Sequence, residues 1–199
     1  MAEIEIPDNS VHSKTRSEWR DWLESHHTQP TGVWLISYKK ATGLAYVDYD
    51  SAVEEALCFG WIDSVPRKLD DMRSMLYFAP RKTGSGWSRL NKQRIDKMLD
   101  ADLMMPAGLA KLEVAKQDGS WTALDAVENL EIPDDLAAAF AEYDQAASNF
   151  EAFPRSAKRG ILEWISNAKR PTTRAKRIAE TAELAQQNIR ANQWPKRNP

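Results

Sequence analysis

A short basic loop in the middle of the chain carries residue types that can hold an anion. Residues 78–91 read FAPRKTGSGWSRLN, in which two glycines follow the cations Arg81 and Lys82. Backbone amides of such a loop, and the N-terminus of a helix after it, attract negative charge. Residues 56–64 read ALCFGWIDS and place Asp63 close behind a tryptophan. We expect a ligand-binding pocket where the two motifs meet, formed by Trp61, Asp63, Arg81, Lys82, Ser85, Trp87 and Asn91.

Asp63 and Arg81 allow two interpretations. The favoured one is a structural ion pair that fixes two strands against the following helix, because a buried carboxylate needs a partner. In the alternative, Arg81 and the loop amides hold an anionic group between the rings of Trp61 and Trp87. The loop lacks the G-x-x-x-x-G-K-[ST] spacing of a phosphate-binding loop, so its glycines alone do not predict a phosphate site.

The single cysteine, Cys58, is a weak candidate for a nucleophile. A thiolate requires a nearby base, a cation or a helix N-terminus. Cys58 instead falls near the expected C-terminal end of a helix, where the helix dipole and the carboxylates of Glu54 and Glu55 disfavour negative charge. We therefore predict a packed cysteine, two solvent-facing glutamates and no catalytic residue.

Strand and helix patterns place these motifs in an α+β fold, a small antiparallel sheet packed with helices and followed by an all-helical C-terminal part. Residues 33–38, VWLISY, form a β-branched and aromatic run of strand length. Strands near 61–68 and 73–79, joined by a turn at 69–71, are expected to pair as an antiparallel hairpin that the first strand flanks. The helices expected around these strands are one opened by Ser13 or Thr15, one at about 50–60 capped by Asp50-Ser51, and one capped by Ser88.

The C-terminal part shows only helical patterns and an abrupt change of charge. Residues 117–154 hold nine acidic residues and no lysine or arginine, whereas residues 155–177 hold eight basic residues and one acidic residue. Such blocks usually form solvated faces of neighbouring helices, and these two could face each other. The alternative is a basic ridge for an acidic partner, formed by Lys169, Arg170, Arg174 and Arg177. Nucleic acid is the less favoured partner, since Glu180 and Glu183 continue the same helix.

Length and composition limit the domain organisation, the location and the cofactors to be expected for this protein. The 199 residues are 42% hydrophobic, which suffices for a globular core. We expect a flexible N-terminus at 1–12, an α+β core at 13–120 and a helical region at 121–199 packed on that core. No apolar run approaches the ~20 residues that span a bilayer, and the N-terminus lacks a signal-peptide pattern, so we expect a soluble, cytoplasmic protein. The three histidines all lie near the N-terminus, so neither a metal site nor a cofactor is expected. The residues do not indicate an oligomeric state.

Three motifs together, ALCFGWID, FAPRKTGSGWSRLN and AKRPTTRAKRI, resemble bacterial proteins of the YdeI/OmpD-associated family over about residues 30–190. The resemblance implies a link with bacteriocin protection, antimicrobial-peptide tolerance and an outer-membrane porin, without a settled biochemical activity. It favours a non-catalytic binding protein that acts in envelope stress or antimicrobial-peptide tolerance through a small anionic ligand or a protein partner. The alternatives are an uncharacterised enzyme that uses an Asp63/Arg81 pocket and a nucleic-acid binder that uses the basic C-terminal helices.

Overall fold

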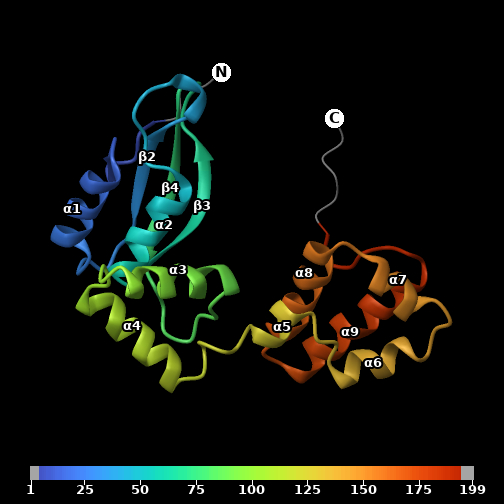
Figure 1. Cartoon of the computed structure of the whole chain (residues 1–199). Coiled ribbons are helices and arrows are strands. Elements are labelled where there is room, and N and C mark those ends of the chain that lie inside the picture. Colours follow the sequence, from blue (N-terminus) through green and yellow to red (C-terminus); the bar gives the residue numbers. More distant parts are fainter. Residues whose placement is uncertain (1–4, 194–199) are drawn as a thin grey trace. The chain divides into compact units, whose positions relative to one another are not determined.

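The computed structural model describes residues 5–193 and separates into two compact units, Met1–Ala123 and Leu124–Pro199 (Figure 1). The first unit combines a four-stranded sheet with helices, and the second is helical in its described part. The α+β class predicted from the sequence is therefore confirmed. The boundary between the units falls after Ala123, three residues beyond the boundary at 120/121 that the sequence suggested.

The sheet is ordered β1-β2-β4-β3, from the strands β1 (Ser10–His12), β2 (Val33–Tyr38), β3 (Trp61–Lys68) and β4 (Arg73–Pro80). The β3–β4 hairpin and its flanking strand β2 are antiparallel, as predicted. Strand β1 corrects the prediction of a flexible segment at 1–12 and an all-antiparallel sheet, because residues 10–12 pair with β2 in parallel. Three residues are too few to show a period of two, so only the pairing with β2 defines this strand.

The helices of the first unit begin close to the predicted capping residues. They are α1 (Arg16–His26), the short 3₁₀ helix η1 (Lys40–Thr42), α2 (Tyr49–Cys58), α3 (Arg89–Asp100) and α4 (Pro106–Gln117). The Thr15 and Ser88 side chains cap α1 and α3 as expected, each accepting a hydrogen bond from a first-turn amide. For α2 the predicted cap at Asp50-Ser51 is wrong, because Asp48 accepts from the Ser51 amide instead. The run DYDS offers several capping side chains, and local preference does not choose among them.

Helices α1 and α2 pack on one face of the sheet, where they share a core with β2 and β4. Trp19 from α1 is fully buried, and its indole N–H donates to the carbonyl of Ala52 in α2 over 3.0 Å. This bond ties the two helices together inside the apolar layer. Each large side chain buried here contributes roughly 1.5–3 kcal/mol through removal of apolar surface from water.

An ion network around two buried glutamates joins α1, α2 and α3. Glu54 and Glu55 are 4% and 2% exposed, so the prediction that they face solvent is wrong. Glu55 accepts hydrogen bonds from Arg16 and Arg20 of α1, at 2.5 and 2.6 Å, and Glu54 accepts from Arg16 and from Lys97 of α3. The helical period of α2 placed both carboxylates opposite its apolar face, but the neighbouring helices cover that side as well.

The second unit contains α5 (Asp125–Asn129), α6 (Asp134–Phe140), α7 (Ala146–Ala152), α8 (Arg155–Ser166) and α9 (Pro171–Gln186). Its core gathers Phe140, Phe150, Ile161, Leu162 and Ala182. The prediction of an all-helical C-terminal part is confirmed over the described residues. With five residues, α5 is too short to show a helical period in sequence.

Candidate functional site

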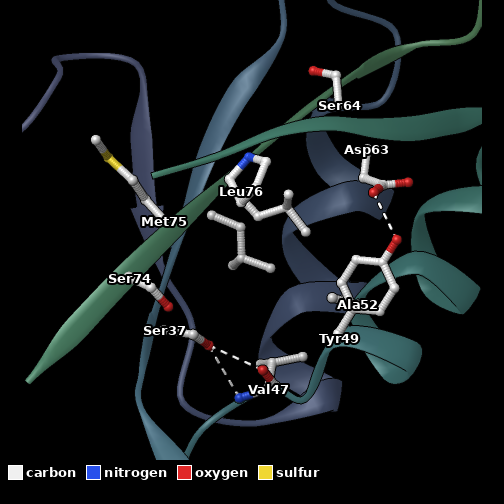
Figure 2. Close-up of a pocket in the computed structure, with 11 residues that line it drawn as sticks. Ser37, Val47, Tyr49, Ala52, Asp63, Ser64, Ser74, Met75 and Leu76 are labelled. Atoms are coloured by element: carbon white, nitrogen blue, oxygen red, sulfur yellow. Dashed lines mark hydrogen bonds between the residues drawn. The ribbon is translucent and has the colours of Figure 1, made fainter. Parts of the chain in front are cut away.

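A cavity of about 340 Å³ lies in the first unit between α2 and the inner face of the sheet (Figure 2). This volume falls within the range of roughly 300–1,000 Å³ that small-molecule sites occupy. Its wall is formed by Leu35, Ser37, Val47, Tyr49, Ala52, Asp63, Ser64, Pro66, Ser74, Met75 and Leu76. Among these residues only Asp63 was predicted from the sequence to belong to a site.

The cavity exists because side chains become smaller along one face of the sheet. The β2–β4 register pairs Val33 with Phe78, Leu35 with Leu76, and then Ser37 with Ser74. Alternate residues of a strand share a face, so these three pairs form one continuous row. Bulky side chains fill the first end of the row, while the two serines leave space at the other. Small polar residues at positions 37 and 74 of two strands were the signal by which the sequence could have indicated the cavity. Only the strand register shows that these two serines lie opposite each other.

The polar groups of the cavity lie at opposite sides in Figure 2. On one side the Tyr49 hydroxyl donates to Asp63 Oδ2 over 2.9 Å, and on the other the Ser37 hydroxyl bonds to the backbone N–H and carbonyl of Val47, both over 3.2 Å. Burial is the largest cause of a raised pKa at Tyr49, and the hydrogen bond to Asp63 raises it further. The hydrogen bond to Asp63 therefore favours the protonated, donating form of the Tyr49 phenol.

Asp63 does not pair with Arg81, which corrects the ion pair favoured from the sequence, and the two residues line different cavities. The Arg81 guanidinium is 5% exposed, lies 3.7 Å from the centroid of the Trp87 ring, and donates to the carbonyls of Ser85 and Gly86. Its Nε is buried without a hydrogen-bond partner, and burial lowers the pKa of Arg81 to about 10. Arg81 thus holds the loop closed through backbone carbonyls and an aromatic ring.

The space beside Arg81 is much smaller than the cavity at Asp63. It measures about 10 Å³ and includes Lys82, Gly84, Lys111 and Asp118 in its wall. Such a volume admits about one water-sized group. The structure therefore brings Arg81, Lys82 and Trp87 together and separates them from Asp63.

The other predicted ligand-binding residues make contacts outside both cavities. Trp61 is 1% exposed, and its indole N–H donates to the carbonyl of His27 over 2.9 Å. The Ser85 hydroxyl donates to the carbonyl of Lys82, and the Asn91 side-chain oxygen accepts from Arg94. These contacts fix the core edge, the loop and the first turn of α3.

Cys58 is buried, and its surroundings disfavour the thiolate. Burial raises the pKa of the Cys58 thiol to about 11, and the negative charge of Glu55 adds to the effect. A nucleophilic role needs the opposite shift. The expectation of a packed cysteine agrees with this environment.

The basic ridge of the second unit is partly engaged within that unit. Arg174 donates twice to Asp135, at 2.6 and 2.8 Å, and so connects the basic and acidic blocks. The Arg177 guanidinium lies 4.9 Å from the Trp164 ring centroid and donates to the Trp164 carbonyl. Lys169 and Arg170 are exposed. The two arginines therefore have structural contacts that any partner binding would have to replace.

Within residues 5–193, no group of three histidine, cysteine, aspartate or glutamate side chains is placed to hold a metal ion. Across the same described residues, no helix combines the length and the apolar character that crossing a membrane requires.

Two family models match the chain, and they divide it close to the boundary between its units. Residues 11–111, which include the cavity, match a domain of unknown function (DUF8412), and residues 129–188 match the family described as Bacteriocin-protection, YdeI or OmpD-Associated. No curated protein and no solved structure matches the chain significantly. The two tryptophan motifs lie in the first matched range, and AKRPTTRAKRI lies in the second. The chain belongs to the DUF8412 family through residues 11–111, and its residues 129–188 form a domain that matches the family described as Bacteriocin-protection, YdeI or OmpD-Associated.

Proposed function

We propose that this protein is a non-catalytic binding protein whose N-terminal unit takes up one small, partly apolar molecule and which acts in tolerance of bacteriocins or antimicrobial peptides. The observation that carries the proposal is the cavity of about 340 Å³ between α2 and the sheet. The link to tolerance comes from the description of the family that matches residues 129–188. Cytoplasmic action, expected from the sequence, belongs to the same proposal.

The wall of the cavity suits recognition of a small organic molecule. Leu35, Val47 and Leu76 offer apolar surface, whose burial by a ligand is favourable by roughly 25 cal/mol per Å². Tyr49 and Asp63 add a hydrogen-bonding pair at one side, and a few fixed polar groups in an apolar wall are typical of ligand sites.

Binding is favoured over catalysis because the cavity holds few titratable groups. Acid–base catalysis needs two groups with separated pKa values and separate access to the substrate. Tyr49 and Asp63 are the titratable side chains in the described wall, and they are hydrogen-bonded to each other. This pair can orient a ligand but lacks a second base.

The test of binding is a fragment screen monitored by the methyl NMR signals of Ala52, Val47 and Leu76. Compounds that enter the cavity should shift these signals in a saturable way, and Leu76→Trp should abolish the shifts by filling the space. Val65→Trp is the matched control, since Val65 is an exposed residue of β3 outside the cavity wall. If no compound shifts the three methyl signals, or if Leu76→Trp leaves binding intact, the cavity is not a binding site.

The test of tolerance is survival of a bacterial host that produces the protein during bacteriocin challenge. Wild-type protein and Val65→Trp should raise survival equally, whereas Leu76→Trp should lose the effect at an equal protein level. Equal protection by all three proteins would show that the cavity plays no part in tolerance.

An anion beside Arg81 is a second candidate, because this buried guanidinium has no carboxylate partner in the described structure. The volume of about 10 Å³ restricts such a ligand to a very small ion. The Gly84 amide already donates to Asp118 Oδ2 over 3.1 Å, so sodium chloride, compared with sodium gluconate at equal ionic strength, should then shift the amide signal of Gly86. Arg81→Gln should remove the shift, and identical spectra in the two salts would refute this candidate.

A further inference from the structure

We infer that the molecule bound in the cavity is an organic monocation, with an ammonium group held by Asp63 and an apolar body against Leu35 and Leu76. This inference rests on the proposed binding function and adds the chemical class of the ligand. It departs from the anionic ligand expected from the sequence, because the cations that motivated that expectation lie at the other site.

The charge of the cavity is the first reason. Asp63 is the one charged residue in the described wall, and no arginine, lysine or histidine lines it. An anionic ligand would lose its hydration and face a like charge. A cation that leaves water at this place gains a carboxylate partner, which is the condition under which burial of a charge is tolerated.

The unfilled hydrogen-bonding capacity of Asp63 is the second reason. Its Oδ2 accepts from Tyr49, and within residues 5–193 the carboxylate has no other hydrogen bond and no ion pair. A carboxylate offers about four acceptor positions, so Asp63 retains acceptor positions that no described residue fills. Because Tyr49 already supplies one neutral donor, a charged donor on the ligand completes the site.

The nearest cation of α3 does not take this role. The Arg94 guanidinium lies 5.4 Å from the Tyr49 ring centroid, but it donates to Asp50 at 2.5 Å and to Asn91 at 2.8 Å. Its charge is therefore balanced by Asp50, which is not part of the cavity wall. The position of Arg94 also shows that the face of the Tyr49 ring accepts a cation, as electron-rich rings do.

The apolar part of the wall sets the rest of the ligand. Figure 2 shows Leu76 between the Tyr49–Asp63 pair and the side that carries Ser37 and Ser74. The hydroxyl of Ser37 is already engaged by the backbone of Val47. A single ring or a short branched chain attached to the ammonium group would cover the apolar surface of Leu35 and Leu76.

Three probes of similar shape and different charge, benzylammonium, benzyl alcohol and benzoate, distinguish the effect of ligand charge from the effect of ligand shape. Titration followed by the methyl signals of Ala52 and Leu76 should give a Kd for benzylammonium at least tenfold below that of benzyl alcohol, with no saturable shift from benzoate. Asp63→Asn should erase the difference between the amine and the alcohol. Asp21→Asn is the matched control, since it removes the same charge from an exposed position of α1.

A second variant guards against loss of fold in Asp63→Asn. Tyr49→Phe keeps the carboxylate and should retain the preference for benzylammonium over benzyl alcohol. If benzyl alcohol or benzoate binds as tightly as benzylammonium, and Leu76→Trp abolishes that binding, the cavity is a binding site but the cation inference is refuted. If none of the three probes shifts the methyl signals while compounds of the fragment screen do, the cation inference is refuted and the proposed binding function stands; if no compound of the screen shifts them, both fall.

Discussion

Gly108 allows α4 to approach the end of α2, and its replacement by alanine should destabilise the first unit. A Cβ atom at this position would lie 2.2 Å from the carbonyl oxygen of Cys58 and 2.7 Å from its carbonyl carbon. Both are backbone atoms, so no side chain can rotate away. The helices would have to separate by roughly 1 Å to restore an ordinary contact.

The size of the effect follows from three contributions. Alanine gains about 1 kcal/mol over glycine in helix propensity. Overpacking of a close interior contact costs about 1–3 kcal/mol. Separation would also weaken the hydrogen bond from the Met105 amide to the Cys58 carbonyl, now 3.1 Å, by about 1 kcal/mol. We therefore expect Gly108→Ala to lower the free energy of unfolding by about 1–3 kcal/mol.

Gly160→Ala is the matched control, because Gly160 also lies inside a helix and a Cβ there meets no atom within 4 Å. This variant should be more stable than wild type by about 0.5–1 kcal/mol. Urea unfolding can be followed for both variants by circular dichroism. Tryptophan fluorescence reports mainly on the first unit, since residues 1–123 contain six of the eight tryptophans. Equal stabilisation by the two alanines would refute the close approach of α4 to α2.

Three further predictions test the burial of charge and the surroundings of the cavity. Glu55→Gln should lower the free energy of unfolding by about 1–2 kcal/mol, because Arg16 and Arg20, both partly exposed, lose a buried carboxylate partner. Urea titration measures this change, and the exposed control Glu24→Gln should alter the free energy of unfolding little. The Cys58 thiol, with a pKa raised from 9.0 to about 11, should react at pH 8 roughly 100-fold more slowly with a thiol reagent in the folded protein than in urea, and equal rates would contradict its environment. The pKa of the Tyr49 phenol should lie above its ordinary value, and it should be lower in Asp63→Asn than in the wild-type protein. NMR titration of labelled tyrosine measures both values. Equal pKa values in the two proteins would argue against the hydrogen bond to the carboxylate.

Local sequence patterns were sufficient for most elements of the first unit. The run at 33–38 and the hairpin around residues 69–71 were predicted because alternation and turn residues act over a few positions. Thr15 and Ser88 were predicted as helix caps for the same reason, since a capping side chain bonds within its own first turn. The elements that were missed, such as β1 and α5, are too short to carry a period.

The candidate site could be predicted only in part, because its residues meet through contacts between distant segments. Asp63 was identified as a site residue, but its partner is Tyr49 of α2 and not Arg81. Arg81 and Trp87 were expected to lie together, and they do, because six positions and one closed loop separate them. Bonding partners across separate elements cannot be read from spacing alone.

The amino-acid sequence by itself determined the α+β class, the antiparallel hairpin and the family resemblance, because periodicity, turns and motifs are properties of contiguous residues. Only the tertiary structure decided that Glu54 and Glu55 are buried in an ion network, and that Ser37 and Ser74 face each other across a cavity. Burial depends on which elements cover a surface, and a cavity depends on the register that aligns small side chains from separate strands. Both arise from packing between segments that are far apart in the chain.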